Sequence, residues 1–200
     1  MTPFIYLASQ SPRRRQLLEQ LGVAYELLLP SASEDAEALE IEIPNESPTD
    51  YVRRVTALKL DAALNRREAR ALREAPIVCS DTTVALGHQI FGKPHDSEDA
   101  VRMLCELSGQ THRVLTAVVL GTRSRRVSAL SESLVTFAQM TQKQVEAYVN
   151  TGEPLGKAGA YAIQGRAAAY VSRLEGSYTG IMGLPMFETA NLLRSFGFEV

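Results

Sequence analysis

The segment S-Q-S-P-R-R-R at residues 9–15 joins a predicted helix start to three consecutive cations. Ser11 is a typical N-cap residue, and Pro12 suits the first helical position. A helix N-terminus already carries about half a positive charge, so arginines in the first turn disfavour the helix unless an anion binds there. Backbone N–H groups and guanidinium groups would together hold a phosphate. The segment therefore predicts a phosphate-binding turn, although without a ligand it would be a basic surface turn.

Three side chains of this segment are the candidate ligand contacts: Ser9, Arg13 and Arg14. Ser9 directly follows residues 4–8, an apolar run that is typical of a buried strand. Successive helical residues point about 100° apart, so the three arginines cannot all reach one ligand. We therefore assign Arg13 and Arg14 to the ligand and Arg15 to solvent.

A lysine falls on the apolar side of the helix that Ser47-Pro48 is predicted to begin. Lys59 follows Val52 by seven positions and Val55 by four, which places it on the same side of the helix. A buried ammonium group is costly unless it is paired. A phosphate would pair it, and the alternative is a lysine whose amino group reaches back to water.

An aspartate interrupts the apolar run at residues 77–84. Aspartate is depleted in strands, and side chains at the end of a buried strand often belong to a site. Asp81 could ligate Mg²⁺ or take a proton from an attacking water, whereas its alternative role is to cap a turn. Lys93 follows the predicted hairpin and could return a second ammonium group to the same place. Glu34, in the acidic loop 31–45, is an upstream candidate for a second metal contact, although most carboxylates of such a loop are simply solvated.

The loop K-A-G-A-Y-A-I-Q-G at residues 157–165 consists mainly of small residues and carries one amide. Small residues let the backbone approach a planar ligand closely. The amide of Gln164 offers both donors and an acceptor for the edge of a base. This loop predicts a base-binding segment, or otherwise a flexible surface loop.

The composition is that of a single globular domain over residues 1–200. Charged residues make up 22% and the net charge is −2, which argues against a nucleic-acid-binding face. The N-terminus lacks the features of a signal peptide, and no apolar run approaches the roughly 18 residues of a membrane span. We expect a cytoplasmic protein that binds neither nucleic acid nor membrane.

The helices and strands that must position these residues do not alternate in strict βαβ order. This predicts an α/β fold with a mixed sheet. Helices are predicted to begin at residues 12, 48, 97, 142 and 185. Strands are predicted at residues 4–8, 23–29, 76–79, 82–86, 90–91, 113–120, 127–137 and 168–173.

Together, these motifs resemble the Maf family of nucleoside triphosphate pyrophosphatases. The resemblance covers nearly the whole chain. It is carried by L-A-S-Q-S-P-R-R at residues 7–14, Lys59, S-D-T at 80–82, G-K-P at 92–94, L-S-G-Q-T at 107–111 and the loop at 157–165. The implied fold is α/β, with a long curved sheet flanked by helices and a cleft between two lobes, similar to inosine triphosphatase. A homodimer is compatible with this resemblance.

The resemblance implies hydrolysis of a nucleoside triphosphate to the monophosphate and pyrophosphate with Mg²⁺ or Mn²⁺. Asp81 matches the family's proton acceptor and, with Glu34, its metal contacts. The positions that match its phosphate contacts are Ser9, Arg13, Arg14, Lys59 and Lys93.

Arg13, Thr82 and Gln164 match the positions linked to base preference in the family. The loop with Gln164 resembles that of the subgroup acting on dTTP and UTP, and modified pyrimidine nucleotides are further candidates. One alternative is a pyrophosphatase for 7-methyl-GTP or another purine triphosphate, whose subgroup carries an acidic residue in place of Gln164. A second is a non-catalytic regulator that senses nucleotides, which would need the cations but not Asp81.

Overall fold

The computed structural model describes residues 4–31, 34–35 and 37–200. Its α-helices are α1 (Pro12–Gln20), α2 (Pro48–Ala69), α3 (Ser97–Leu107), α4 (Gln142–Val149), α5 (Tyr178–Met182) and α6 (Met186–Ser195). Its strands are β1 (Ile5–Leu7), β2 (Tyr25–Leu27), β3 (Ile77–Leu86), β4 (Gln89–Phe91), β5 (Thr111–Gly121), β6 (Arg126–Phe137) and β7 (Val171–Glu175). Short 3₁₀ helices are η1 (Glu37–Glu40), η2 (Ala158–Ala160) and η3 (Arg166–Tyr170).

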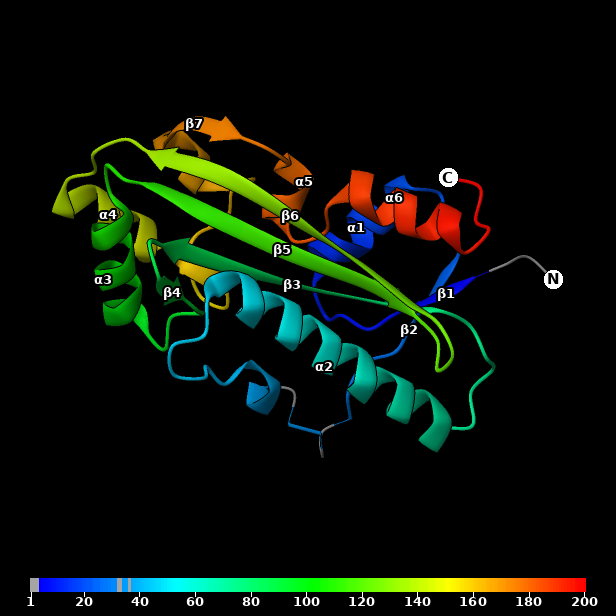
Figure 1. Ribbon diagram of the computed structural model, residues 1–200. Coiled ribbons are helices and arrows are strands. Elements are labelled where there is room, and N and C mark those ends of the chain that lie inside the picture. Colours follow the sequence, from blue (N-terminus) through cyan, green and yellow to red (C-terminus); the bar gives the residue numbers. More distant parts are fainter. Residues whose placement is uncertain (1–3, 32–33, 36) are drawn as a thin grey trace.

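One mixed sheet runs through the described part of the chain (Figure 1). The strand order is β2-β1-β3-β5-β6-β7, with β4 paired separately to β3. The long strand β5 is antiparallel to both of its neighbours, β3 and β6, whereas β1 pairs in parallel with both β2 and β3. The expected mixed α/β fold is confirmed.

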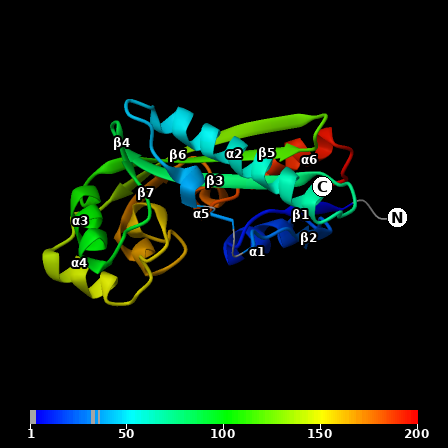
Figure 2. The ribbon, with the colours of Figure 1, turned by 90° about the horizontal axis from the view of Figure 1, so that it is seen from below.

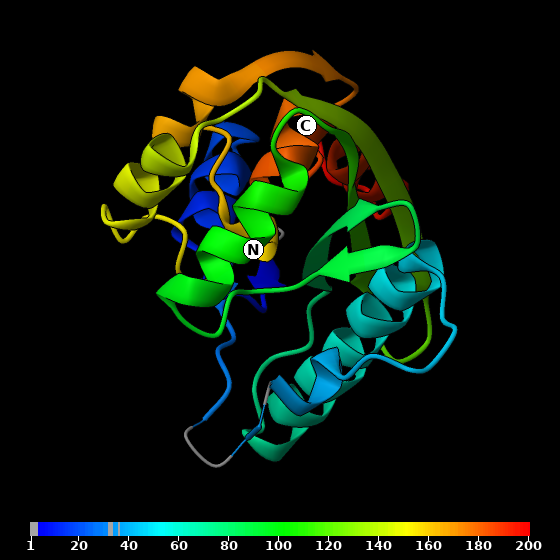
Figure 3. The same cartoon turned by 90° about the vertical axis from the view of Figure 1, so that its left-hand side faces the viewer.

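Helices cover both faces of this sheet, as alternation along the strands requires. Val78 and Val118 pack with α1 and α6 on one face, whereas Cys79 and Val119 pack with α2 on the other. Figure 2 shows α2 lying across the strands of the sheet. Helices α3 and α4 pack together at the end of the sheet near β4, which faces the viewer in Figure 3.

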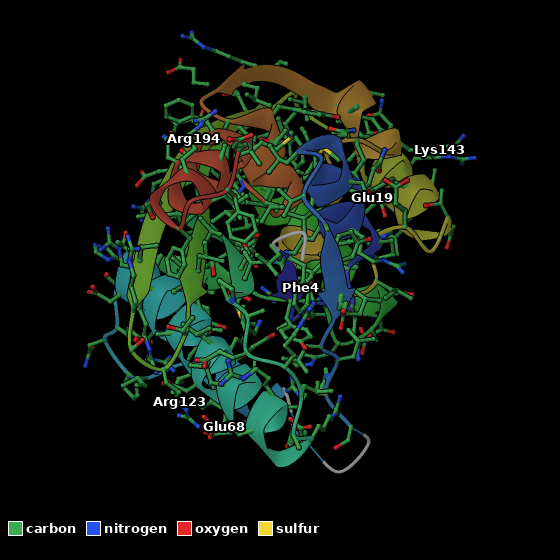
Figure 4. All side chains as sticks on the ribbon, turned by 90° about the vertical axis from the view of Figure 1, so that its right-hand side faces the viewer. Phe4, Glu19, Glu68, Arg123, Lys143 and Arg194 are labelled. Carbon is green, nitrogen blue, oxygen red and sulfur yellow. The ribbon has the colours of Figure 1, made fainter. Side chains whose placement is uncertain are left out.

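Local sequence signals fix the ends of several helices. Ser47 accepts a hydrogen bond from the Asp50 N–H at the start of α2, and Thr141 forms a capping box at the start of α4. The other end of α2 is held to the turn between β5 and β6, because Arg123 binds Glu68 at 2.6 Å. These two residues are labelled side by side in Figure 4.

The sequence-based expectations differ from the structure at several elements. The strand expected at residues 168–173 begins only at Val171, because residues 168–170 belong to η3. Residues 76–79 and 82–86 were expected as separate strands, but β3 is continuous because β5 pairs with it from Ile77 to Ala85. Helix α5 was not expected, since its five residues are too few for a recognisable apolar period. None of the described helices combines the length and apolarity needed to cross a membrane.

The packing of α2 against the sheet gives a stability prediction. Leu64 is fully buried between α2 and the sheet, whereas Leu72 beyond the helix is 39% exposed. Leu64→Ala should lower the free energy of unfolding by about 2 to 5 kcal/mol, because it removes buried methyl groups and leaves a cavity. Leu72→Ala should cost less than about 1 kcal/mol. Denaturant unfolding checks both, and equal losses would contradict this packing.

Candidate active site

A gap in the sheet lies along one edge of β3. One edge of β3 pairs with β5 along nearly its whole length. On the other edge, β1 pairs with Ile77 and Val78, and β4 pairs with Val84 to Leu86. The described strands therefore leave residues 79–83 unpaired on this edge, and Asp81 lies at the middle of the gap. An aspartate is tolerated in a buried strand here because the edge opens into a cavity.

The cavity at this gap has a volume of about 470 Å³, a size typical of small-molecule sites. Five segments contribute to its walls: the start of α1, the middle of α2, β3, the turn after β4 and the loop before η3. Eight of the nine predicted site residues line it, which are Ser9, Arg13, Arg14, Lys59, Asp81, Thr82, Lys93 and Gln164. The structure thus brings together residues that are far apart in the sequence.

Lys59 lies between two carboxylates at the wall formed by α2. Its Nζ atom is 2.5 Å from Asp81 Oδ1 and 2.7 Å from Glu40 Oε1. The side chains of Lys59 and Asp81 are only 19% and 11% exposed, so water screens this pair weakly. The predicted ammonium group on the apolar side of α2 is therefore paired within the protein. The two carboxylates can be no further apart than the sum of these two distances.

Glu40, at the end of η1, is a site residue that sequence reasoning missed. Its second carboxylate oxygen binds Lys93 Nζ at 2.8 Å, and its backbone carbonyl accepts a hydrogen bond from the Tyr51 hydroxyl at 2.9 Å. Burial alone would raise the pKa of Glu40, but the ammonium groups of Lys59 and Lys93 outweigh burial and lower that pKa. Glu40 is therefore an anion held among the cations of the cavity. Nothing in the acidic loop distinguishes it from its neighbours in sequence.

Arg13 and Arg14 are oriented by backbone carbonyl groups. Arg13 Nε donates to the Met182 carbonyl at 3.4 Å, and Arg14 Nε donates to the Gly183 carbonyl at 2.7 Å. Burial lowers the pKa of both guanidinium groups, and the nearby charge of Asp81 partly offsets this effect for Arg14. The short helix α5 and the turn that follows it are thus a platform for the two arginines.

Gly183 is required at this platform. Its φ of 111° lies in a region that favours glycine, and an added Cβ would lie 3.3 Å from Arg14 Nε. Its carbonyl also accepts a hydrogen bond from Ser80 Oγ at 2.9 Å. The sequence G-I-M-G-L-P at residues 180–185 contains the signal, but only the fold connects it to Arg14.

Ser9 completes the cationic wall. Its hydroxyl oxygen accepts hydrogen bonds from the Ser11 N–H at 3.2 Å and from Arg14 Nη1 at 3.4 Å. Both interactions use lone pairs of the oxygen, so the hydroxyl proton can be offered to an anion. Together with the free N–H groups at the start of α1, this wall suits a phosphate.

The loop that carries Gln164 is anchored on both sides. The Tyr148 hydroxyl accepts from the Ala162 N–H at 3.3 Å and donates to the Glu153 carboxylate at 2.8 Å. The same carboxylate accepts from the Arg166 N–H at 3.2 Å. A Cβ on Gly165 would overlap this carboxylate, so a larger residue there would displace the Glu153 side chain. The segment is therefore a fixed turn that holds Gln164 at the cavity, and the alternative of a flexible surface loop does not apply.

Glu34 is the one predicted site residue that the structure does not bring to the cavity. Its carboxylate binds Arg66 at 2.7 Å and lies 3.7 Å from Arg70. The hydrogen bond from Arg66 is the main cause that lowers the pKa of Glu34 to about 2. The carboxylate that shares Lys59 with Asp81 is that of Glu40 instead, because η1, and not the beginning of the acidic loop, reaches the two lysines.

The carboxylates at the gap match the chemistry of a hard divalent cation. Within the described residues, no three His, Cys, Asp or Glu side chains are close enough to hold a metal ion by themselves. Mg²⁺ commonly takes only one or two carboxylates and completes its shell with phosphate oxygens and water. Asp81 and Glu40, which share Lys59, fit that pattern.

Comparisons with known proteins show what this chain is similar to. The family model described as "Maf-like protein" matches residues 4–196. A dTTP/UTP pyrophosphatase of Albidiferax ferrireducens is 68% identical over the full length of both chains. One of Cupriavidus metallidurans is 64% identical over 98% of each chain. Among solved structures, the Staphylococcus aureus Ham1 protein is similar, with 12% identity, a TM-score of 0.46 and 96% of each chain covered.

The family model covers nearly the whole chain, and the relative from Albidiferax ferrireducens is 68% identical over its full length. The chain belongs to the Maf family.

Proposed function

We propose that this protein is a nucleoside triphosphate pyrophosphatase that hydrolyses dTTP and UTP to the monophosphate and pyrophosphate. The observation that supports it best is the buried pair of Asp81 and Lys59 in a cavity that also holds Arg13, Arg14 and Lys93. The cations match a triphosphate, and the carboxylate matches a proton acceptor. Relatives with 58–68% identity are named dTTP/UTP pyrophosphatases.

In the proposed reaction, the triphosphate lies between the start of α1 and the lysines. Asp81 accepts a proton from a water that attacks the α-phosphorus, and the new bond joins the water oxygen to that phosphorus. The bond from the α-phosphorus to the bridging oxygen breaks, and pyrophosphate leaves with the electron pair. Arg14, Lys59 and Lys93 stabilise the charge that develops on the leaving group.

We further propose that the protein uses a divalent cation, Mg²⁺ or Mn²⁺, which the carboxylates of Asp81 and Glu40 would hold. When bound, it would supply charge neutralisation to the phosphates. This assignment moves the second acidic contact from Glu34 to Glu40, because Glu40 shares Lys59 with Asp81 and Glu34 is paired with Arg66.

The metal assignment predicts different effects for two glutamates of the same loop. Glu40→Gln should raise the metal concentration needed for half-maximal activity by about tenfold or more, because it removes one charged ligand. Glu34→Gln, the matched control, should leave that concentration unchanged. Titrations of pyrophosphate release with Mg²⁺ and Mn²⁺ measure both. If Glu34→Gln shifts the titration and Glu40→Gln does not, the metal contact lies at Glu34.

A panel of triphosphates with Mg²⁺ and Mn²⁺ tests the proposed activity. We expect dTTP and UTP to give pyrophosphate faster than the purine triphosphates, because Gln164 at the cavity offers an amide instead of an acidic group. A preference for 7-methyl-GTP would assign the chain to the other subgroup, and faster turnover of a modified pyrimidine would identify that nucleotide as substrate. Binding of UTP without pyrophosphate from any triphosphate would indicate a nucleotide sensor.

The cellular setting is part of the same proposal. Nucleoside triphosphates are intracellular metabolites, so we infer a cytoplasmic enzyme that acts on small molecules and not on nucleic acid. A homodimer is proposed from the family resemblance alone, and sedimentation of the purified chain tests it.

A further inference from the structure

A chain of hydrogen bonds runs from the cavity into the protein through two threonines. Thr82 on β3 and Thr116 on β5 are direct partners across the sheet, and their hydroxyl oxygens are 3.0 Å apart. The Thr116 hydroxyl is also 2.7 Å from the Gly180 carbonyl oxygen in α5. Thr82 lines the cavity, whereas Thr116 is 1% exposed and does not line it.

The direction of these hydrogen bonds follows from the number of protons. A carbonyl oxygen only accepts, so the Thr116 hydroxyl must donate its single proton to Gly180. The Thr116 oxygen can then only accept in its contact with Thr82. Thr82 therefore donates its own proton to Thr116, and its hydroxyl presents only lone pairs to the cavity.

A hydroxyl that can only accept is a poor partner for a phosphate. Ionised phosphate oxygens are acceptors, so Thr82 would face them lone pair to lone pair. Thr82 also lies on the opposite face of β3 from Asp81, because neighbouring residues of a strand alternate. The ligand group at Thr82 must therefore be a donor. The base donor that uracil and thymine share is N3–H, whereas cytosine has an unprotonated acceptor at N3.

We propose that Thr116 is a specificity-determining residue that acts through Thr82. By taking the Thr82 proton, it makes Thr82 an obligate acceptor for the base N3–H, and so favours UTP and dTTP over CTP. Thr116 is a positioning residue in this role, because it touches Thr82 and not the cavity. The inference rests on the proposed function and names the group that selects the base.

The test compares the ratio of kcat/KM for UTP to that for CTP in variants at position 116. Thr116→Val keeps the shape but cannot hold the Thr82 proton, so Thr82 can turn and donate to the N3 of cytosine. The ratio should fall about tenfold, the effect of one hydrogen bond, with the change mainly in KM. Thr116→Ser retains the hydroxyl and should keep the wild-type ratio.

A double-mutant cycle separates this role from a structural one. In a Thr82→Val background, Thr116→Val should change the ratio no further, because there is no hydroxyl left to orient. An unchanged ratio in Thr116→Val, or an equal fall with and without Thr82, would overturn the proposal. Thermal unfolding checks each variant, and Thr116→Ala replaces Thr116→Val if the latter does not fold. Failure of the wild type to hydrolyse UTP or dTTP would instead refute the proposed function.

Discussion

Asp81→Asn is expected to lower kcat for UTP hydrolysis by about 10² to 10⁴, the usual effect of removing a general base. Asparagine has nearly the same shape, but its amide cannot take a proton from water. Lys59 keeps its second partner, Glu40, at 2.7 Å, so the cation should stay in place. Release of pyrophosphate at saturating UTP and metal measures the loss.

Asp61→Asn is the matched control for this prediction. Asp61 lies on α2, is 44% exposed and binds Arg126 at 2.6 Å away from the cavity. The chemical change is the same, but turnover should remain near the wild-type value, since an exposed ion pair contributes little. Thermal unfolding of both variants separates lost chemistry from lost structure. A folded Asp81→Asn protein with turnover within about threefold of wild type would exclude Asp81 as the base.

The parts of the fold that the sequence predicts are those set by local interactions. Ser47 and Thr141 begin α2 and α4 as expected, because an N-cap side chain satisfies the N–H groups of its own first turn. The helix start at Pro12 was equally predictable. These signals depend on residues within four positions of one another, so they do not require knowledge of the rest of the chain.

Long-range pairing explains what the sequence did not predict. The continuity of β3 depends on β5, because Ile77 pairs with Gly121 and Ala85 pairs with Arg113, far along the chain. The position of Glu40 depends on lysines contributed by α2 and by the turn after β4. An acidic loop offers many similar carboxylates, and only the fold selects one. Glu34 was chosen from the same loop and lies instead against Arg66.

Eight of the nine candidate site residues line one cavity, although the continuity of β3 beside them was not expected. Each residue was inferred from a conflict with its surroundings, such as arginines at a helix N-terminus or a lysine on an apolar face. The structure resolves two of these conflicts within the protein. Arg13 and Arg14 donate hydrogen bonds to backbone carbonyls, and Lys59 forms ion pairs with Asp81 and Glu40. Such internal partners keep the cations oriented before a ligand arrives.

The two lysines of the site should differ in importance, because their surroundings differ. Lys59 is 19% exposed and contacts both Asp81 and Glu40, whereas Lys93 is 44% exposed and contacts Glu40 at 2.8 Å. Lys59→Met should lower kcat/KM for UTP by about 10² to 10³, since it removes a poorly screened charge and leaves two neighbouring carboxylates to repel the phosphates. Lys93→Met should cost only about tenfold, because water already screens its charge.

Lys59→Arg serves as the control for charge without the same geometry. It should recover part of the loss, since a guanidinium keeps the charge but cannot occupy the position of a compact ammonium group between the two carboxylates. Steady-state kinetics of the three variants, with thermal unfolding of each, gives the comparison. Equal losses for Lys59→Met and Lys93→Met would mean that the phosphates lie at the open side of the cavity. A larger loss at Lys59 would place them against β3, where the open edge of the sheet exposes Asp81 to the attacking water.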